Sequence, residues 1–268
     1  MRPTRGFAEV NGARLYYETA GSGEPLVLVH GFSLDTRVWD GQWEAFSGCY
    51  RVIRYDLRGF GKSSLPDGGG YSHHEDLKAL LDWLGVSPAR VLGHSTGGSI
   101  ALDFAVSHPE MLRALVLFGS IAAGFDYSPE FAGALGSIYA AAQMWGIGSA
   151  REIWLRLLDI RPVENPDAAA ELHRIVADYS GWHWLNADPA ISLDPPALQR
   201  LDAIRAPTLT ILGEREVPDC FRIAERVNRG VPGAEQVVLP GLGHMAHMEA
   251  PSRFNDAVLG FLERSAAP

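Results

Sequence analysis

The chain has 268 residues, of which 47% are hydrophobic, and it carries a formal charge of −9 at pH 7. This length is sufficient for one core with a modest inserted subdomain. The acidic balance argues against a nucleic-acid partner and against an anionic membrane surface. The sequence shows no apolar stretch of signal-peptide or membrane-span length, and its two cysteines lie far apart. These features favour a cytoplasmic protein with free thiols.

Taken in chain order, the sequence predicts a hairpin and then buried strands that alternate with helices. Residues 7–10 and 14–18 flank an Asn-Gly pair, which is typical of a tight hairpin turn. Apolar runs then predict further strands at 26–29, 51–55, 91–92, 114–118, 208–212 and 236–239. Helical patterns lie between them, at 74–84, 96–108, 221–228 and 252–262. This alternation indicates a mostly parallel sheet covered on both faces.

The alternation stops after Phe118 and resumes near Pro207. Residues 121–201 show helical segments rich in small and aromatic side chains, without a strand pattern. We therefore expect a helical cap at 121–201, inserted in a core domain of residues 1–120 and 202–268. Concave apolar sites form at such junctions, so four cap tryptophans are expected to line a substrate pocket. They are Trp145, Trp154, Trp182 and Trp184.

Residues 93–97 read Gly-His-Ser-Thr-Gly and lie between an apolar run and a helical pattern. A Gly-x-Ser-x-Gly motif in this strand–turn–helix context is what a nucleophile elbow requires. Glycines on both sides of the serine avoid side-chain clashes in so tight a turn. Ser95 is therefore the predicted nucleophile.

A serine hydroxyl is a weak nucleophile at neutral pH, so it needs a base and an acid that orients the base. His244 follows the last strand on a loop with two glycines, and we interpret it as the base. His247 lies at helical spacing from it, but no third metal ligand accompanies the pair. The acid is expected after the strand at 208–212, where Glu216 is preferred over Asp219 and Glu214.

Backbone N–H groups are needed to stabilise the oxyanion that forms during attack on a carbonyl. Thr96 supplies one, because it follows the nucleophile at the start of a helix whose dipole adds to the effect. The second is assigned to Phe32, in the His-Gly-Phe loop after the strand at 26–29. His30 is expected to shape this loop and to border the pocket. No motif implies a metal or a cofactor.

Ser95, an acid and His244 follow one another in the order found in the α/β-hydrolase superfamily, which the chain resembles. The loop at 30–32, the Asp-x-Arg-Gly-x-Gly-x-Ser segment at 56–63 and the run at 243–251 are also similar to that superfamily. The resemblance covers essentially the whole chain. It implies a mostly parallel eight-stranded sheet flanked by helices, with an inserted helical cap.

One position departs from the superfamily pattern, because members usually carry aspartate where this chain has Glu216. Asp219, or Asp126 after the strand at 114–118, therefore remain open as alternative acids.

The resemblance implies a serine hydrolase that cleaves a carboxylic ester or lactone of a small, largely apolar substrate through an acyl-enzyme. One alternative is hydrolysis of a C–C bond in dienoic ketones, which similar proteins perform with the same three residues. The other is a small-molecule receptor that retains the fold without catalysis. The expected partner is a small molecule, and the sequence fixes neither its identity nor the oligomeric state.

Overall fold

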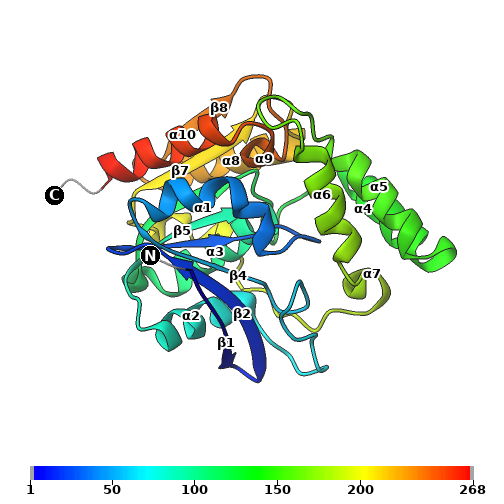
Figure 1. The fold of residues 1–268 in the computed structure, drawn as a ribbon, viewed down its shortest axis with the longest axis horizontal. Helices are drawn as coiled ribbons and strands as arrows, with labels where there is room; N and C mark the ends of the chain where they lie inside the picture. Colours follow the sequence, from blue (N-terminus) through cyan, green and yellow to red (C-terminus); the bar gives the residue numbers. More distant parts are fainter. Residues whose placement is uncertain (1–2, 266–268) are drawn as a thin grey trace.

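An eight-stranded sheet with the strand order β1-β2-β4-β3-β5-β6-β7-β8 forms the centre of the protein. A computed structural model describes residues 3–265 (Figure 1). Strands β3 to β8 are parallel to one another, whereas β2 is antiparallel to both of its neighbours. The prediction of a mostly parallel sheet with an antiparallel hairpin at one edge is confirmed.

The strands form where the sequence has apolar runs, because both faces of the sheet are covered. Strands β5 and β7 are buried along their whole length, whereas β8 at the sheet edge is partly exposed. In the turn between β1 and β2, Asn11 and Gly12 both have positive φ, at 48° and 72°. The bounds are β1 Thr4–Val10, β2 Ala13–Ala20, β3 Pro25–Val29, β4 Arg51–Tyr55, β5 Ala89–His94, β6 Leu112–Phe118, β7 Thr208–Gly213 and β8 Glu235–Leu239.

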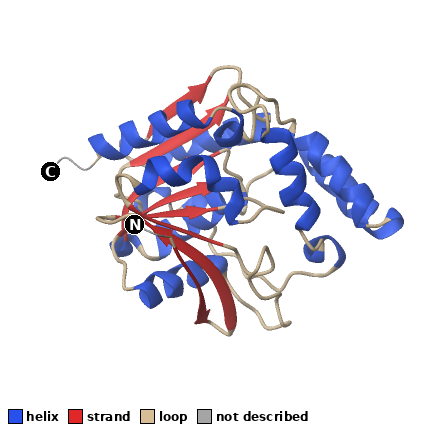
Figure 2. Cartoon of the chain, viewed as in Figure 1, coloured by secondary structure: helices blue, strands red, loops and turns tan. Residues whose placement is uncertain are grey.

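Helices cover both faces of the sheet, with α1 and α10 packed against each other on one of them (Figure 2). The bounds in the core are α1 Asp40–Ser47, α2 His73–Leu84, α3 Thr96–Ser107, α8 Pro218–Gly230, α9 Ala246–Glu249 and α10 Pro251–Arg264. Short 3-10 helices lie at Thr36–Trp39, Pro109–Met111, Ala197–Gln199 and Leu201–Ala203. Helix α1 was not predicted, since it fully buries only Gln42 and Phe46 and shows no apolar stripe.

Four helices between β6 and β7 gather beyond the carboxyl ends of the strands, at the right in Figures 1 and 2. They are α4 Pro129–Trp145, α5 Ile147–Leu158, α6 Ala168–Asp178 and α7 Trp182–Leu185. This is the segment expected to form the cap. Across residues 3–265, no helix is both long enough and apolar enough to cross a membrane.

Candidate active site

Ser95 lies in the turn between β5 and α3, at φ 53° and ψ −115°. Residues other than glycine rarely adopt a positive φ, so this turn is strained. The Ser95 N–H donates to the carbonyl of Phe118 at 2.9 Å, which fixes the turn to the next strand. A Cβ atom at Gly93 would collide with the carbonyl of Gly97, and one at Gly97 with the carbonyl of Val29. The turn therefore requires both glycines of the motif, and its serine side chain borders a cavity.

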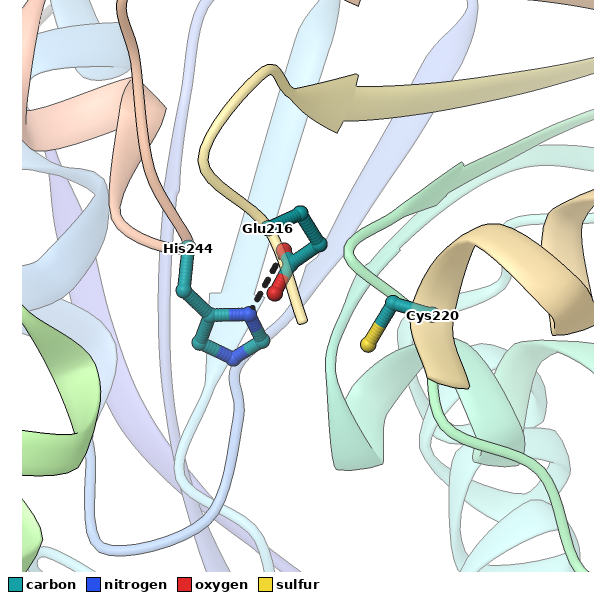
Figure 3. A group of neighbouring side chains, drawn as sticks. All are labelled: Glu216, Cys220 and His244. Atoms are coloured by element: carbon teal, nitrogen blue, oxygen red, sulfur yellow. Dashed lines mark hydrogen bonds and ion pairs between the residues drawn. The ribbon is translucent and has the colours of Figure 1, made fainter. Parts of the chain in front are cut away.

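Glu216 and His244 form a hydrogen-bonded pair beside this cavity (Figure 3). Glu216 lies on the loop after β7, and its Oε2 is 2.8 Å from Nδ1 of His244 on the loop after β8. Burial lowers the pKa of His244, but the charge and the hydrogen bond of Glu216 together outweigh burial and raise that pKa above the ordinary value for histidine. A carboxylate only accepts hydrogen bonds, so Nδ1 carries the proton and Nε2 is left available as a base.

Ser95 and His244 line the same cavity, but no hydrogen bond joins their side chains among the described residues. Such contacts are often long in unliganded enzymes and tighten when substrate is bound. The arrangement therefore suits a nucleophile and base that complete their contact around a substrate.

Two glycines, Gly119 and Gly31, leave space for the side chains of Ser95, Glu216 and His244. Gly119 follows β6 with φ 49°, and a Cβ there would lie 2.7 Å from Oε2 of Glu216 and 3.1 Å from Nδ1 of His244. A Cβ at Gly31 would lie 3.1 Å from the Cβ of Ser95. A side chain at Gly119 would therefore displace Glu216, and one at Gly31 would press on Ser95.

The other carboxylates considered as the acid are held away from the imidazole. Asp219 accepts hydrogen bonds from the N–H and the hydroxyl of Ser128, at 3.0 and 2.6 Å, at the start of α4. Asp126 is exposed, and Glu214 is exposed on the same loop as Glu216. Among these four carboxylates, Glu216 is the one bonded to the imidazole.

The N–H groups assigned to oxyanion stabilisation are free to donate. Neither Phe32 nor Thr96 uses its backbone N–H in a hydrogen bond within residues 3–265. Thr96 begins α3, where the first N–H groups of a helix have no partner inside the helix. Both residues line the cavity that contains Ser95. The geometry is therefore compatible with an oxyanion hole.

The cavity that Ser95 and His244 border has a volume of about 200 Å³ and is lined mainly by apolar side chains. Of the four cap tryptophans, Trp154 and Trp184 line this cavity. The expectation was wrong for Trp145, which is 68% exposed at the end of α4, and for Trp182, which packs against His183 outside the cavity lining. Aromatic character identified cap residues, but not the side of the helix on which each one lies.

His30 is also outside the cavity lining, contrary to expectation. It is fully buried, with Nδ1 2.8 Å from the carbonyl oxygen of Gly31 and Nε2 3.0 Å from the N–H of Leu57. Burial lowers the pKa of His30, so the ring is neutral. The neutral ring donates from Nδ1 to the carbonyl of Gly31 and accepts the N–H of Leu57 at Nε2. These two bonds fix the shape of the loop that carries Phe32.

Two further histidines pack behind the base. His94 contacts the carbonyl oxygen of His244 through Nε2 at 3.0 Å, and burial holds its pKa well below the ordinary value. His247 is fully buried, and burial together with the neighbouring His244 lowers its pKa to about 3. Both rings are therefore neutral.

Glu249, which the sequence analysis did not single out, connects the loops that carry Glu216 and His244. Its side chain is fully buried in α9. Its Oε2 accepts the N–H of Gly243 at 2.7 Å, and its Oε1 accepts from the Arg215 guanidinium at 2.7 Å and from the N–H of Arg161 at 2.6 Å. Gly243 precedes His244 and Arg215 precedes Glu216, so one carboxylate holds both loops. Its place in the run at 243–251 is the one signal in the sequence.

Cys220 at the start of α8 lies near the pair, and the ligand atoms of Glu216, Cys220 and His244 are within 4.8 Å of one another (Figure 3). Burial raises the pKa of the Cys220 thiol well above its ordinary value, which disfavours the thiolate that zinc requires. The Nδ1 of His244 is also already bonded to Glu216. These residues fit an acid–base pair with a neighbouring neutral thiol better than a metal centre.

The fold and the site together define a hydrolase of the α/β type. A family model described as the alpha/beta hydrolase family matches residues 26–257, and the chain belongs to this family. A 2-hydroxy-6-oxononadienedioate/2-hydroxy-6-oxononatrienedioate hydrolase from Paraburkholderia phymatum is 32% identical, over 93% of this chain and 91% of that protein.

Two solved structures extend the comparison. A thermophilic esterase from Thermogutta terrifontis has a TM-score of 0.83 and 26% identity, with all of both chains covered. Est816, described as an N-acyl homoserine lactone degrading enzyme, has a TM-score of 0.73 and 29% identity, with 95% of this chain and 99% of that chain covered. The chain is thus similar to enzymes that hydrolyse different bonds on one fold.

Proposed function

We propose that this protein is a serine hydrolase that cleaves a carboxylic ester or a lactone of a small, largely apolar substrate. The observation that carries the proposal is the hydrogen-bonded pair of buried Glu216 and partly buried His244, which borders the same apolar cavity as Ser95 in its strained turn. This combination supplies a nucleophile, an oriented base and a water-poor site for the substrate.

In the first half of the reaction, the Oγ of Ser95 attacks the substrate carbonyl and Nε2 of His244 takes its proton. Glu216 stabilises the imidazolium that forms, and the N–H groups of Phe32 and Thr96 donate to the oxyanion. His244 then gives the proton to the leaving alcohol. In the second half, His244 deprotonates a water molecule, which attacks the acyl-enzyme and releases the acid.

Hydrolysis of a C–C bond is the alternative suggested by the Paraburkholderia phymatum relative, whose name specifies a dioate substrate. A buried carboxylate of a substrate needs a cationic or strongly donating partner. The described residues that line the cavity include no lysine or arginine, and they do include the carboxylate of Glu216. This lining favours a neutral ester or lactone over a doubly charged substrate.

The test is a hydrolysis panel of p-nitrophenyl butyrate, a neutral lactone and a dienoic ketone, measured on the wild-type protein and on Ser95→Ala. We expect turnover of the ester or lactone that Ser95→Ala loses, with much slower turnover of the ketone. Preferential cleavage of the ketone would favour the C–C alternative. Ligand binding without turnover of any substrate would favour the receptor.

We also propose a cytoplasmic location. Cys49 is free and exposed, and Cys220 is free and buried, which suits a reducing compartment. Fractionation of the source cells with an antibody against the protein tests this proposal, and recovery outside the cytoplasmic fraction would contradict it.

A further inference from the structure

One face of the cap helix α4 borders the catalytic cavity over two turns. The residues that line it are Phe131, Leu135, Ile138 and Tyr139. Their spacing of four, three and one residues places them on the same side of the helix. Eight residues of α-helix rise by about 12 Å, so the cavity follows α4 over about that length.

Three buried side chains of the neighbouring cap helices also line the cavity. They are Trp154 and Leu158 on α5 and Trp184 on α7. An apolar cavity of about 150 Å³ holds one benzene ring, so the present volume corresponds to about six to eight carbon atoms. The part of the cavity that lies along this face of α4 is called the slot below.

The slot is lined mainly by the carbon atoms of apolar side chains. The hydroxyl of Tyr127 is occupied, since it donates to the carbonyl of Ala122 and accepts from the N–H of the same residue, both at 3.0 Å. The indole N–H of Trp154 is buried and has no hydrogen-bond partner among the described residues, so it adds one polar donor to a wall that is otherwise mainly apolar. Tyr139, at one end of this lining, is 40% exposed and marks where the slot meets water. The occupant of the slot is therefore an apolar chain.

We propose that the slot along α4 binds the acyl group of the substrate as a straight chain of six to eight carbons. This inference rests on the proposed acyl-enzyme, because the acyl group is the part that stays attached to Ser95 after the alcohol leaves. An enclosed apolar slot stabilises that part through both steps. Each added methylene that enters the slot increases kcat/KM by about fourfold, until the slot is full.

The test measures kcat/KM for p-nitrophenyl esters from acetate to dodecanoate. The wild-type protein should show its maximum at six to eight carbons. Leu135→Trp fills the middle of the slot and should move the maximum to four carbons or fewer, with a fall of at least tenfold in the octanoate-to-acetate ratio. Leu135→Ala should move the maximum to longer chains. Two opposite shifts guard against a variant that simply folds poorly.

Gly136→Ala is the matched control on the same helix. Gly136 is exposed, and a Cβ there would meet no atom within 4 Å, so its chain-length profile should equal that of the wild type. A second series of alkyl acetates, from ethyl to octyl, tests whether the chain belongs to the alcohol.

A wild-type maximum at acetate, or an unchanged maximum in both Leu135 variants, would overturn the slot as the acyl site. A preference that follows the alcohol series would also overturn it. In all these cases the serine hydrolase proposal stands. The absence of turnover with every ester would instead overturn the proposed function itself.

Discussion

Replacing Glu216 with glutamine tests the acid most sharply, because the change keeps the shape of the side chain and removes its charge. In the structure, Oε1 of Glu216 accepts the N–H of Val217 at 2.9 Å, and Oε2 accepts Nδ1–H of His244 at 2.8 Å. The amide of the variant has one oxygen for these two donors. If that oxygen stays with Val217, its NH₂ group faces Nδ1, and the imidazole proton moves to Nε2.

The wrong tautomer cannot act as a base toward Ser95. In an enzyme with a serine triad, the equivalent change lowers kcat by about 10⁴-fold. The Glu216 side chain is fully buried, so solvent does not screen the lost charge, and we expect a fall of about 10³- to 10⁴-fold. This corresponds to about 4 to 5.5 kcal/mol of lost transition-state stabilisation. Initial rates with p-nitrophenyl butyrate measure it.

The pH profile gives a second readout of the same variant. Activity requires neutral His244, so it rises with pH through the pKa of the imidazole. Glu216 raises that pKa against the effect of burial, so its removal leaves burial to lower it. The acidic limb of kcat/KM should therefore move to lower pH in Glu216→Gln, while the plateau falls.

The control is Glu214→Gln, an exposed carboxylate two residues away that contacts Gly241 rather than the imidazole. Its rate and pH profile should match those of the wild type. Activity of Glu216→Gln within tenfold of the wild type would refute the reasoning, and an inactive Asp219→Asn protein would transfer the role of acid to Asp219.

Three further predictions concern the groups around the pair. Glu249→Gln should lower stability by about 2 kcal/mol and kcat by about 100-fold, because an amide oxygen cannot serve all three donors; urea unfolding and initial rates measure this. Gly119→Ala should lower kcat by about 100-fold, since its Cβ would press on Glu216; steady-state kinetics measure this. Iodoacetamide should label exposed Cys49 and leave Cys220 unmodified, because burial raises the pKa of the Cys220 thiol; peptide mass spectrometry measures this.

Each of these predictions has its own contrary result. Wild-type kinetics in Glu249→Gln would show that the catalytic loops keep their positions without that carboxylate. An unchanged rate in Gly119→Ala would mean that the acid and base have room to move apart. Labelling of Cys220 at the rate of Cys49 in the folded protein would show that the thiol is accessible and ionised.

The sheet was predictable because its strands are buried on both faces. A run such as that in β3, where four of five residues are fully buried, leaves a continuous apolar signal in the sequence. Helix α1 shows no such apolar signal in the sequence. Of its two buried residues, Gln42 is polar, and its side chain donates to the carbonyl of His247 at 3.0 Å. A helix that is buried through a tertiary hydrogen bond shows no apolar periodicity.

The candidate site was predictable for residues whose chemical type and whose place after a strand both point to the same role. Ser95 and His244 each follow a strand on a glycine-containing turn, and Glu216 follows the neighbouring strand. The cavity lining was less predictable, since the helical spacing along α4 gives the lining face only after the helix is placed over the sheet. Glu249 accepts hydrogen bonds from Arg161, Arg215 and Gly243, which lie in three different segments of the chain. No local sequence pattern encodes such a network.

The central claim is that Ser95 is a nucleophile activated by His244. The most direct measurement is intact-protein and peptide mass spectrometry after treatment with a fluorophosphonate, which reacts with activated serines. We predict one adduct, on the peptide that contains Ser95, and none in Ser95→Ala. An unmodified wild-type protein, or an adduct on another residue, would contradict the account.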